Sequence, residues 1–261
     1  MLKTIKYELR KNMNSILLFL GIYALLEVVM IAGVNMHKDS WVGISLSLLF
    51  GVGFASSLFV MTAQVMGYSR ELKDKSGYLV FMTPLSSRRI LGAKLLTTLV
   101  CATILGVFGF GLMLLDYGMV EEVFELEAIP TLLDMVLSQY HTSVRELLLT
   151  GLSWVGMLYL SCIFFVCLCF FSISLSATLL QDKKGKGVIS VVIFLVLFLA
   201  YTWISNHLPV IGKPVLEGMY DTLEFGPGFF LNNIISILFQ VVCSIACWLG
   251  SAWLLDNKIS L

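Results

Sequence analysis

Apolar residues dominate this chain in six long runs, which short polar segments separate. The runs cover residues 15–34, 42–66, 90–115, 147–180, 188–204 and 229–254. A helix of about 20 apolar residues is long enough to cross a bilayer core of about 30 Å. The runs are continuous rather than alternating, which excludes an outer-membrane barrel. The pattern therefore predicts an all-α, polytopic membrane protein with six transmembrane helices.

The segments that flank the runs are predicted to lie at the membrane surfaces. Residues 1–14 place apolar side chains at helical spacing among basic ones, which predicts an amphipathic interfacial helix. Residues 116–146 form an acidic outer loop with a second amphipathic pattern. Residues 205–228, which contain several glycines and prolines, are predicted to form an outer loop or a re-entrant segment. We expect all these parts to form a single transmembrane domain over residues 1–261.

The composition agrees with a membrane protein and not with a soluble domain. Apolar residues make up 58% of the chain and charged residues 13%, whereas soluble chains carry about 25% charged residues. The formal net charge is zero, so nothing indicates a nucleic-acid partner, and membrane lipids are the expected surroundings.

Basic residues are concentrated in alternate connections. Fourteen of the 17 Lys and Arg residues lie in the N-terminal arm, at residues 67–94 and 181–187, and in the C-terminal tail. The other connections hold 11 of the 17 acidic residues. By the positive-inside rule, both termini and the two basic loops are predicted to be cytoplasmic. The expected location is the plasma membrane, and more specifically the cytoplasmic membrane of a bacterium.

The segment at residues 67–89, between the second and third spans, is basic and contains turn-forming residues. Six Lys or Arg residues lie between Arg70 and Lys94. Gly77 permits a sharp turn, and Pro84 disfavours helix at the residue before it. Between these two residues lie Tyr78, Leu79, Val80, Phe81 and Met82. Apolar side chains held at a wet surface indicate a docking face for another protein.

Asp, Glu, Lys and Arg occur at two positions inside the predicted spans. Glu27 is near mid-membrane, where a charge costs about 3 kcal/mol, so its side chain should face protein or water. Glu27 either lines a translocation path or pairs with another group in that path. Alternatively, it is a protonated glutamate that is hydrogen-bonded to a neighbouring helix. Lys94, near the start of the third span, is expected to reach back to the cytoplasmic headgroups.

The sixth span carries a stripe of polar residues at steps of three and four. Its candidate members are Asn233, Ser236, Gln240 and Ser244. Such a stripe faces away from lipid and forms either an interface between helices or part of a path.

Sequence motifs for catalysis are missing. There is no Gly-x4-Gly-Lys-Ser/Thr phosphate loop, and the six cysteines all lie inside apolar runs without zinc-site spacing. We therefore expect a protein that is not an enzyme, with no catalytic residue, cofactor or metal in this chain.

The order of these parts resembles the membrane subunits of ABC-2 type transporters over nearly the whole chain. The most specific matches are Arg70, Glu71, Gly77, Thr83, Pro84, Leu85, Ser86 and the residues from Ile90 to Lys94. In that family, an acidic residue, a glycine and a Pro-Leu-Ser step precede the third span in this way.

The resemblance implies that the segment between the second and third spans forms a cytoplasmic coupling helix, which docks on a separate ATPase. The implied docking residues are Arg70, Glu71, Gly77, Tyr78, Phe81, Met82, Pro84 and Leu85. It also implies half of a permease, completed by a second subunit in a homodimer or heterodimer, with ATP and Mg²⁺ bound by the partner ATPase. Export of a lipid-like molecule, drug or antimicrobial peptide is the implied activity. The alternative is a self-contained carrier or channel, which should place several ionisable groups at mid-membrane, where only Glu27 is found.

Overall fold

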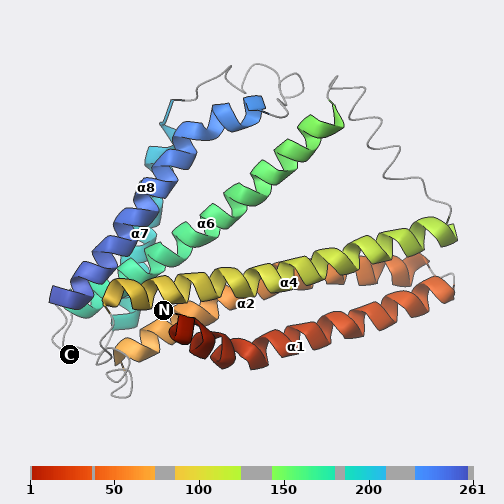
Figure 1. Cartoon of the computed structure of the whole chain (residues 1–261), viewed down its shortest axis with the longest axis horizontal. Helices are drawn as coiled ribbons and strands as arrows, with labels where there is room; N and C mark the ends of the chain where they lie inside the picture. Colours follow the sequence, from red (N-terminus) through yellow and green to blue (C-terminus); the bar gives the residue numbers. More distant parts are fainter. Residues whose placement is uncertain are drawn as a thin grey trace. The chain divides into compact units, whose positions relative to one another are not determined.

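The computed structural model describes residues 2–36, 39–73, 86–124, 143–179, 186–209 and 227–257. Every regular element in these ranges is an α-helix (Figure 1). Six of the helices are long and apolar enough to cross a membrane. The prediction of an all-α chain with six candidate membrane spans is confirmed.

The helices extend past the apolar runs that predicted them. They are α1 (Leu2–Asn35), α2 (Asp39–Lys73), α4 (Ser87–Phe124), α6 (Val144–Leu179), α7 (Lys186–Asn206) and α8 (Pro227–Asn257). Helix α2 includes residues 67–73, which the sequence placed in the loop after the second span. Helix α4 includes residues 116–124, which the sequence placed in the acidic outer loop. At 1.5 Å per residue, the 36 residues of α6 extend over about 54 Å, well beyond the hydrocarbon core.

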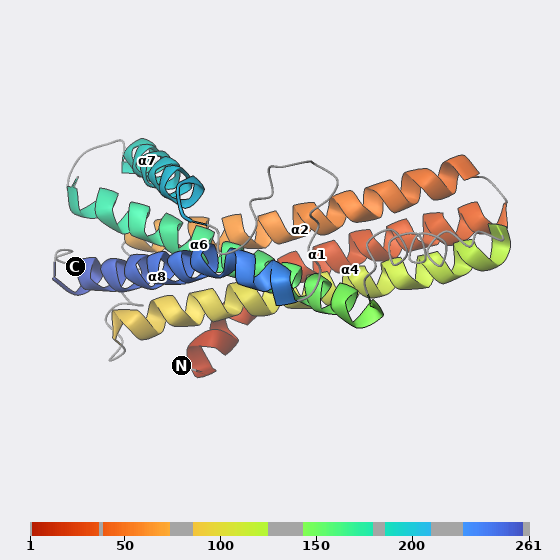
Figure 2. The same ribbon diagram turned by 90° about the horizontal axis from the view of Figure 1, so that it is seen from above.

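Several predicted features lie outside the described residues. These are the apolar stretch at 78–82 with its flanking turn residues, most of the outer loop at 116–146 and most of the segment at 205–228. Residues 2–14, for which an interfacial helix was predicted, belong to α1, which continues without a break into the first candidate span. Its first turns run at an angle to the rest of the helix (Figures 1 and 2).

The chain divides into two compact units, which share α2 and α4. The first unit contains residues 1–66 and 92–131, and the second contains residues 67–91 and 132–261. The C-terminal end of α2 and the first residues of α4 therefore belong to the second unit.

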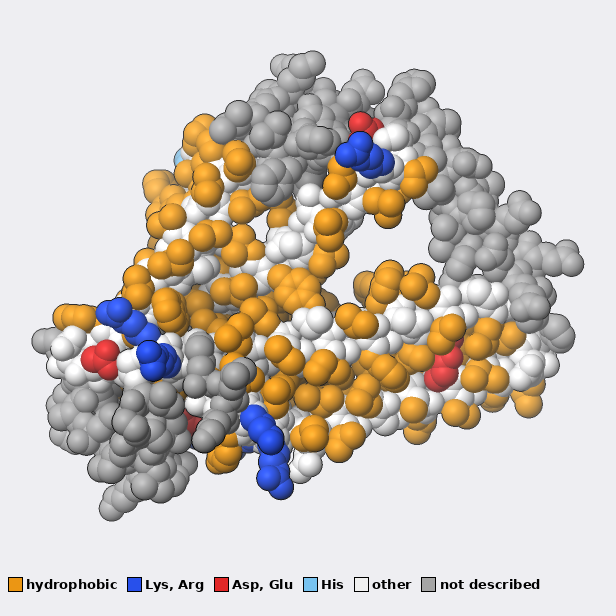
Figure 3. Space-filling view, viewed as in Figure 1, with side chains coloured by type: hydrophobic (Ala, Val, Ile, Leu, Met, Phe, Trp, Pro, Cys, Tyr) orange, Lys and Arg blue, Asp and Glu red, His pale blue; other side chains and the backbone are white. Residues whose placement is uncertain are grey.

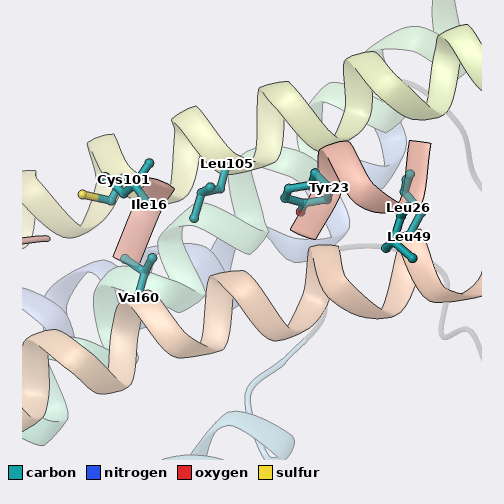
Figure 4. Close-up of a cluster of buried hydrophobic side chains, with 7 residues drawn as sticks. All are labelled: Ile16, Tyr23, Leu26, Leu49, Val60, Cys101 and Leu105. Carbon is teal, nitrogen blue, oxygen red and sulfur yellow. The ribbon is translucent and has the colours of Figure 1, made fainter. Parts of the chain in front are cut away.

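Helices α1, α2 and α4 enclose the core of the first unit. Its buried side chains are Ile16, Tyr23, Leu26, Leu49, Val60, Cys101 and Leu105 (Figure 4). Tyr23 is fully buried, and its hydroxyl lies 3.3 Å from Ser56 Oγ. Because Ser56 donates its own proton to the Gly53 carbonyl, the Tyr23 hydroxyl is the donor to Ser56. Gly53 and Gly109 leave room for the tyrosine hydroxyl, since an added Cβ would lie 3.6 Å and 3.0 Å from it. Small residues thus let the three helices approach closely.

In the second unit, aromatic rings join α7 to the two helices beside it. The Phe164 and Tyr201 rings of α6 and α7 lie 4.2 Å apart, and the Tyr201 and Phe239 rings of α7 and α8 lie 5.5 Å apart. Offset or tilted ring pairs at these distances stabilise by about 1 kcal/mol beyond the area they bury.

Helices α6 and α8 run in the same direction, and their contacting residues keep a constant separation in the sequence. Gln240 donates a 3.1 Å hydrogen bond to Ser161, 79 residues earlier in the chain. Gly250 packs on the ring of Phe171, and this pair has the same sequence separation. A constant separation along two contacting helices requires that they run in the same direction.

Large apolar side chains cover the outer faces of the helices. Phe50 of α2, Leu152 of α6 and Val188 of α7 are among the most exposed. In the space-filling view, apolar side chains are spread over the described parts of the visible face, and charged ones are few (Figure 3). Such a surface requires an apolar surrounding and agrees with a multi-pass membrane protein.

Candidate functional site

Of the predicted docking residues, the structure describes the first two. Arg70 is exposed and Glu71 is half-buried in the last turns of α2. Gly77, Tyr78, Phe81, Met82, Pro84 and Leu85 lie outside the described residues. The site is therefore built from the two ends of this segment, residues 67–73 and 86–91, which belong to the same unit.

Tyr68 fixes the end of α2 against α6. It is fully buried, its hydroxyl lies 2.5 Å from Ser174 Oγ, and its ring centroid lies 4.6 Å from that of Phe170. Ser174 donates its own proton to the Phe170 carbonyl, so the Tyr68 hydroxyl is the donor in the contact with Ser174. The serine thus connects a backbone carbonyl of α6 to the last turns of α2.

Ser87 fixes the start of α4 against α8. Its Oγ donates a hydrogen bond to Asp256 Oδ1 at 2.5 Å. The Ser86 carbonyl accepts the first helical bonds of α4, from the amides of Arg89 and Ile90 at 2.8 Å and 3.3 Å. The next residue, Ser87, therefore has its side chain free to reach α8. The basic side chains of Arg88 and Arg89 are exposed beside it.

These contacts bring four chain segments to one end of the second unit. Ser174 lies near the C-terminal end of α6, and Asp256 lies near the C-terminal end of α8. The two ends of the segment at 74–85 are therefore attached to two different helices at the same end of this unit. A force applied to that segment would act on both attachments.

Lys94 differs from its sequence expectation. It is fully buried in the first unit, and its Nζ donates to Glu8 Oε1 at 2.9 Å, with both side chains almost inaccessible. It therefore does not reach towards headgroups. The sequence pattern did not indicate Glu8, because its partner lies 86 residues away. The available signal was an acidic residue within a basic arm.

Glu27 has an acidic neighbour. It lies half-buried on α1 and interacts with the carboxyl group of Asp116 on α4. Asp116 is wholly buried, and neither of its carboxyl oxygens has a hydrogen-bond donor in place. Asp116 was predicted only as one of the acidic residues of the outer loop, because the apolar run ends just before it.

The polar stripe of α8 faces other parts of the second unit to different degrees. Gln240 bonds to α6 through Ser161. Ser244 is buried and donates to the Gln240 carbonyl of its own helix, at 2.7 Å. Asn233 and Ser236 are half-buried. Gln240 and Ser244 therefore lie at contacts within the unit. A role of the stripe in a translocation path stays a prediction.

Within the described ranges, no three His, Cys, Asp or Glu residues come close enough together to hold a metal ion. The cysteines at positions 101, 162, 167, 169, 243 and 247 are free thiols. The polar side chains described above form hydrogen bonds and an ion pair.

Comparisons of the chain with family models, with curated proteins and with solved structures found no match.

Proposed function

We propose that this chain is the permease subunit of an ATP-binding cassette exporter, and that a separate cytoplasmic ATPase drives it. The observation that supports this most is the attachment of both ends of the segment at 74–85. Tyr68 bonds to Ser174 at one end, and Ser87 bonds to Asp256 at the other. A segment that is fixed at both ends can transmit a force that a partner applies to its middle.

The proposed path of that force follows the chain. Helices α2 and α4 continue from these attachments into the first unit, where they pack with α1. Movement of the segment at 74–85 would therefore act on α6 and α8 through side chains, and on the first unit through the continuous backbones of α2 and α4. Close-packed helices transmit such shifts because their interfaces deform little.

The proposed orientation places this end of the second unit in the cytoplasm. The exposed Arg70, Arg88 and Arg89 lie near the attachments. Basic residues close to the ends of spans favour the cytoplasmic side. Glu8 on α1 pairs with Lys94, which brings the basic N-terminal arm to the beginning of α4. Both termini would then be cytoplasmic.

The proposal assigns separate roles to this chain, to the partner ATPase and to a second permease subunit. The partner ATPase would bind ATP and Mg²⁺, and this chain would supply the docking segment and half of the path. A second permease subunit, identical or not, would supply the other half. The transported molecule would be apolar or amphipathic, in keeping with the apolar faces of the helices.

A self-contained carrier is the second candidate function. The observation that favours it is the acidic pair of Glu27 and Asp116, because ionisable groups inside spans occur at ion and proton pathways. A carrier of this kind would need no ATPase, which separates the two candidates.

The test of the proposed function is purification of the tagged full chain from its native membrane, with mass spectrometry of what accompanies it. We expect an ATPase with ATP-binding cassette motifs in a fixed ratio to this chain. Glu71→Arg and Phe81→Asp should reduce its recovery at least tenfold, because both changes alter the docking face.

The matched control is Arg145→Glu, a charge reversal at an exposed position at the other end of α6. It should leave ATPase recovery unchanged. Recovery that is the same in all four proteins would contradict the docking role, and absence of an ATPase from the wild-type preparation would favour the carrier.

A further inference from the structure

The carboxyl groups of Glu27 and Asp116 are neighbours in the first unit, and the described side chains around them include no positive partner. Asp116 is wholly buried, and both of its oxygens lack a donor, as does the buried Oε2 of Glu27. The two groups interact with one another across α1 and α4. This pair is independent of the docking segment and of the proposed function.

No basic side chain of the three surrounding helices can reach the pair. Helix α1 has no basic residue after Lys11, α2 has none before Arg70, and α4 has none after Lys94. At 1.5 Å per residue, Lys94 lies about 33 Å from Asp116 along the axis of α4. Lys94 is moreover paired with Glu8.

The neighbouring polar groups are already bonded elsewhere. The Tyr23 hydroxyl, one turn before Glu27, donates to Ser56. Ser45 of α2 directs its hydroxyl to Met30 and to carbonyls of its own helix. Residues 40–66 of α2 contain no Asp, Glu, Lys, Arg or His. Among the described side chains around the pair, Tyr23, Glu27 and Asp116 are the titratable ones.

Among these described neighbours, two ionised carboxylates are therefore disfavoured. Burial of one unpaired charge is costly, and a second charge of the same sign raises the cost further. One added proton removes both problems, because the protonated carboxyl becomes an O–H donor to the other carboxylate. Hydrogen bonds of this type are short and strong.

A metal ion fits the pair less well than a proton. Hard cations such as Ca²⁺ and Mg²⁺ take six or more oxygen ligands. No third Asp, Glu, His or Cys joins the two carboxyl groups among the described side chains.

We propose that Glu27 and Asp116 form a proton-binding site that joins α1 to α4. Binding transfers one proton from water to a carboxylate oxygen and creates one O–H···O bond between the helices. Release of the proton leaves two like charges facing one another, so the packing of α1 against α4 loosens as the pH rises.

The experiment is infrared spectroscopy of the purified full chain in lipid nanodiscs, titrated from acidic to alkaline pH. We expect a protonated-carboxyl C=O band at mildly acidic pH that is lost at alkaline pH. The Glu27→Gln/Asp116→Asn double variant should lack this band, and Glu146→Gln should retain it. Absence of the band from the wild type at mildly acidic pH, or its persistence in the double variant, would overturn the proposal.

Two further measurements keep the test decisive if the double variant does not fold. The wild-type band alone must be present at mildly acidic pH and must disappear on alkalinisation. Replacing choline chloride with sodium, calcium or magnesium chloride at the same mildly acidic pH should leave the band unchanged, and its loss would show that a metal ion occupies the site instead.

Discussion

At the scale of single residues, Glu8 and Lys94 form a buried ion pair in the first unit. Both side chains are almost inaccessible, and they are held at 2.9 Å. A buried pair of this kind stabilises little relative to a well-packed apolar pair, but the loss of one partner leaves an uncompensated charge. Its main effect is thus to fix the N-terminal arm at the beginning of α4.

We predict that Lys94→Met destabilises the chain by about 3–5 kcal/mol, because it strands the Glu8 carboxylate. The measurement is the thermal unfolding midpoint of the purified protein in detergent. Lys6→Met, at an exposed position of the same arm, is the control and should change the midpoint little. The double variant Glu8→Leu/Lys94→Met should recover most of the loss. A Lys94→Met midpoint equal to that of the control would mean that the lysine reaches headgroups after all.

The sequence did not reveal which polar residues contact one another, because the partners are far apart in the chain. Tyr68 and Ser174 are 106 residues apart, and Ser87 and Asp256 are 169 apart. Each residue alone fits a span end, where polar side chains are common. Only the packing of the helices brings the members of each pair together.

At the scale of helices, the sequence predicted each span but not where it ends. Membrane insertion depends on the summed hydropathy of about 20 residues, which neighbouring residues change little. A helix ends where capping and loop contacts end it, and it can continue beyond the hydrocarbon core. Helix α2 therefore includes Arg70 and Lys73, which the apolar pattern excluded.

The close contact between α6 and α8 depends on Gly250. A Cβ added there would lie 2.8 Å from Phe171 Cε2, so the ring or the helix would have to move. We predict that Gly250→Ala lowers the stability by about 1–3 kcal/mol, the usual cost of overpacking.

The measurement is again the thermal unfolding midpoint, with Gly156→Ala of α6 as the matched control. An added Cβ at Gly156 has no atom within 4 Å, and alanine favours helix over glycine. The control should be unchanged or more stable. Equal midpoints for the two variants would argue against the close packing of α8 on Phe171.

At the scale of the whole molecule, the six candidate spans were predictable, because the hydropathy of a segment is an additive property of the sequence. The candidate site was predictable only in part. Turn residues and a motif indicated the segment at 67–89. The contacts of Tyr68 and Ser87 show to which helices the two ends of this segment are attached, which the sequence pattern did not indicate. The partner of Glu27 was missed, because Asp116 stands at the boundary of an apolar run.

The central claim is that a cytoplasmic protein binds the apolar stretch at residues 78–82. The most direct measurement is photo-crosslinking in native cells, with a benzophenone amino acid in place of Phe81. Trp154, an exposed position on α6, is the control for a lipid-facing site. The account predicts a crosslink from position 81 to an ATP-binding cassette ATPase and none from position 154. Crosslinks from position 81 to lipid alone, or only within this chain, would contradict it.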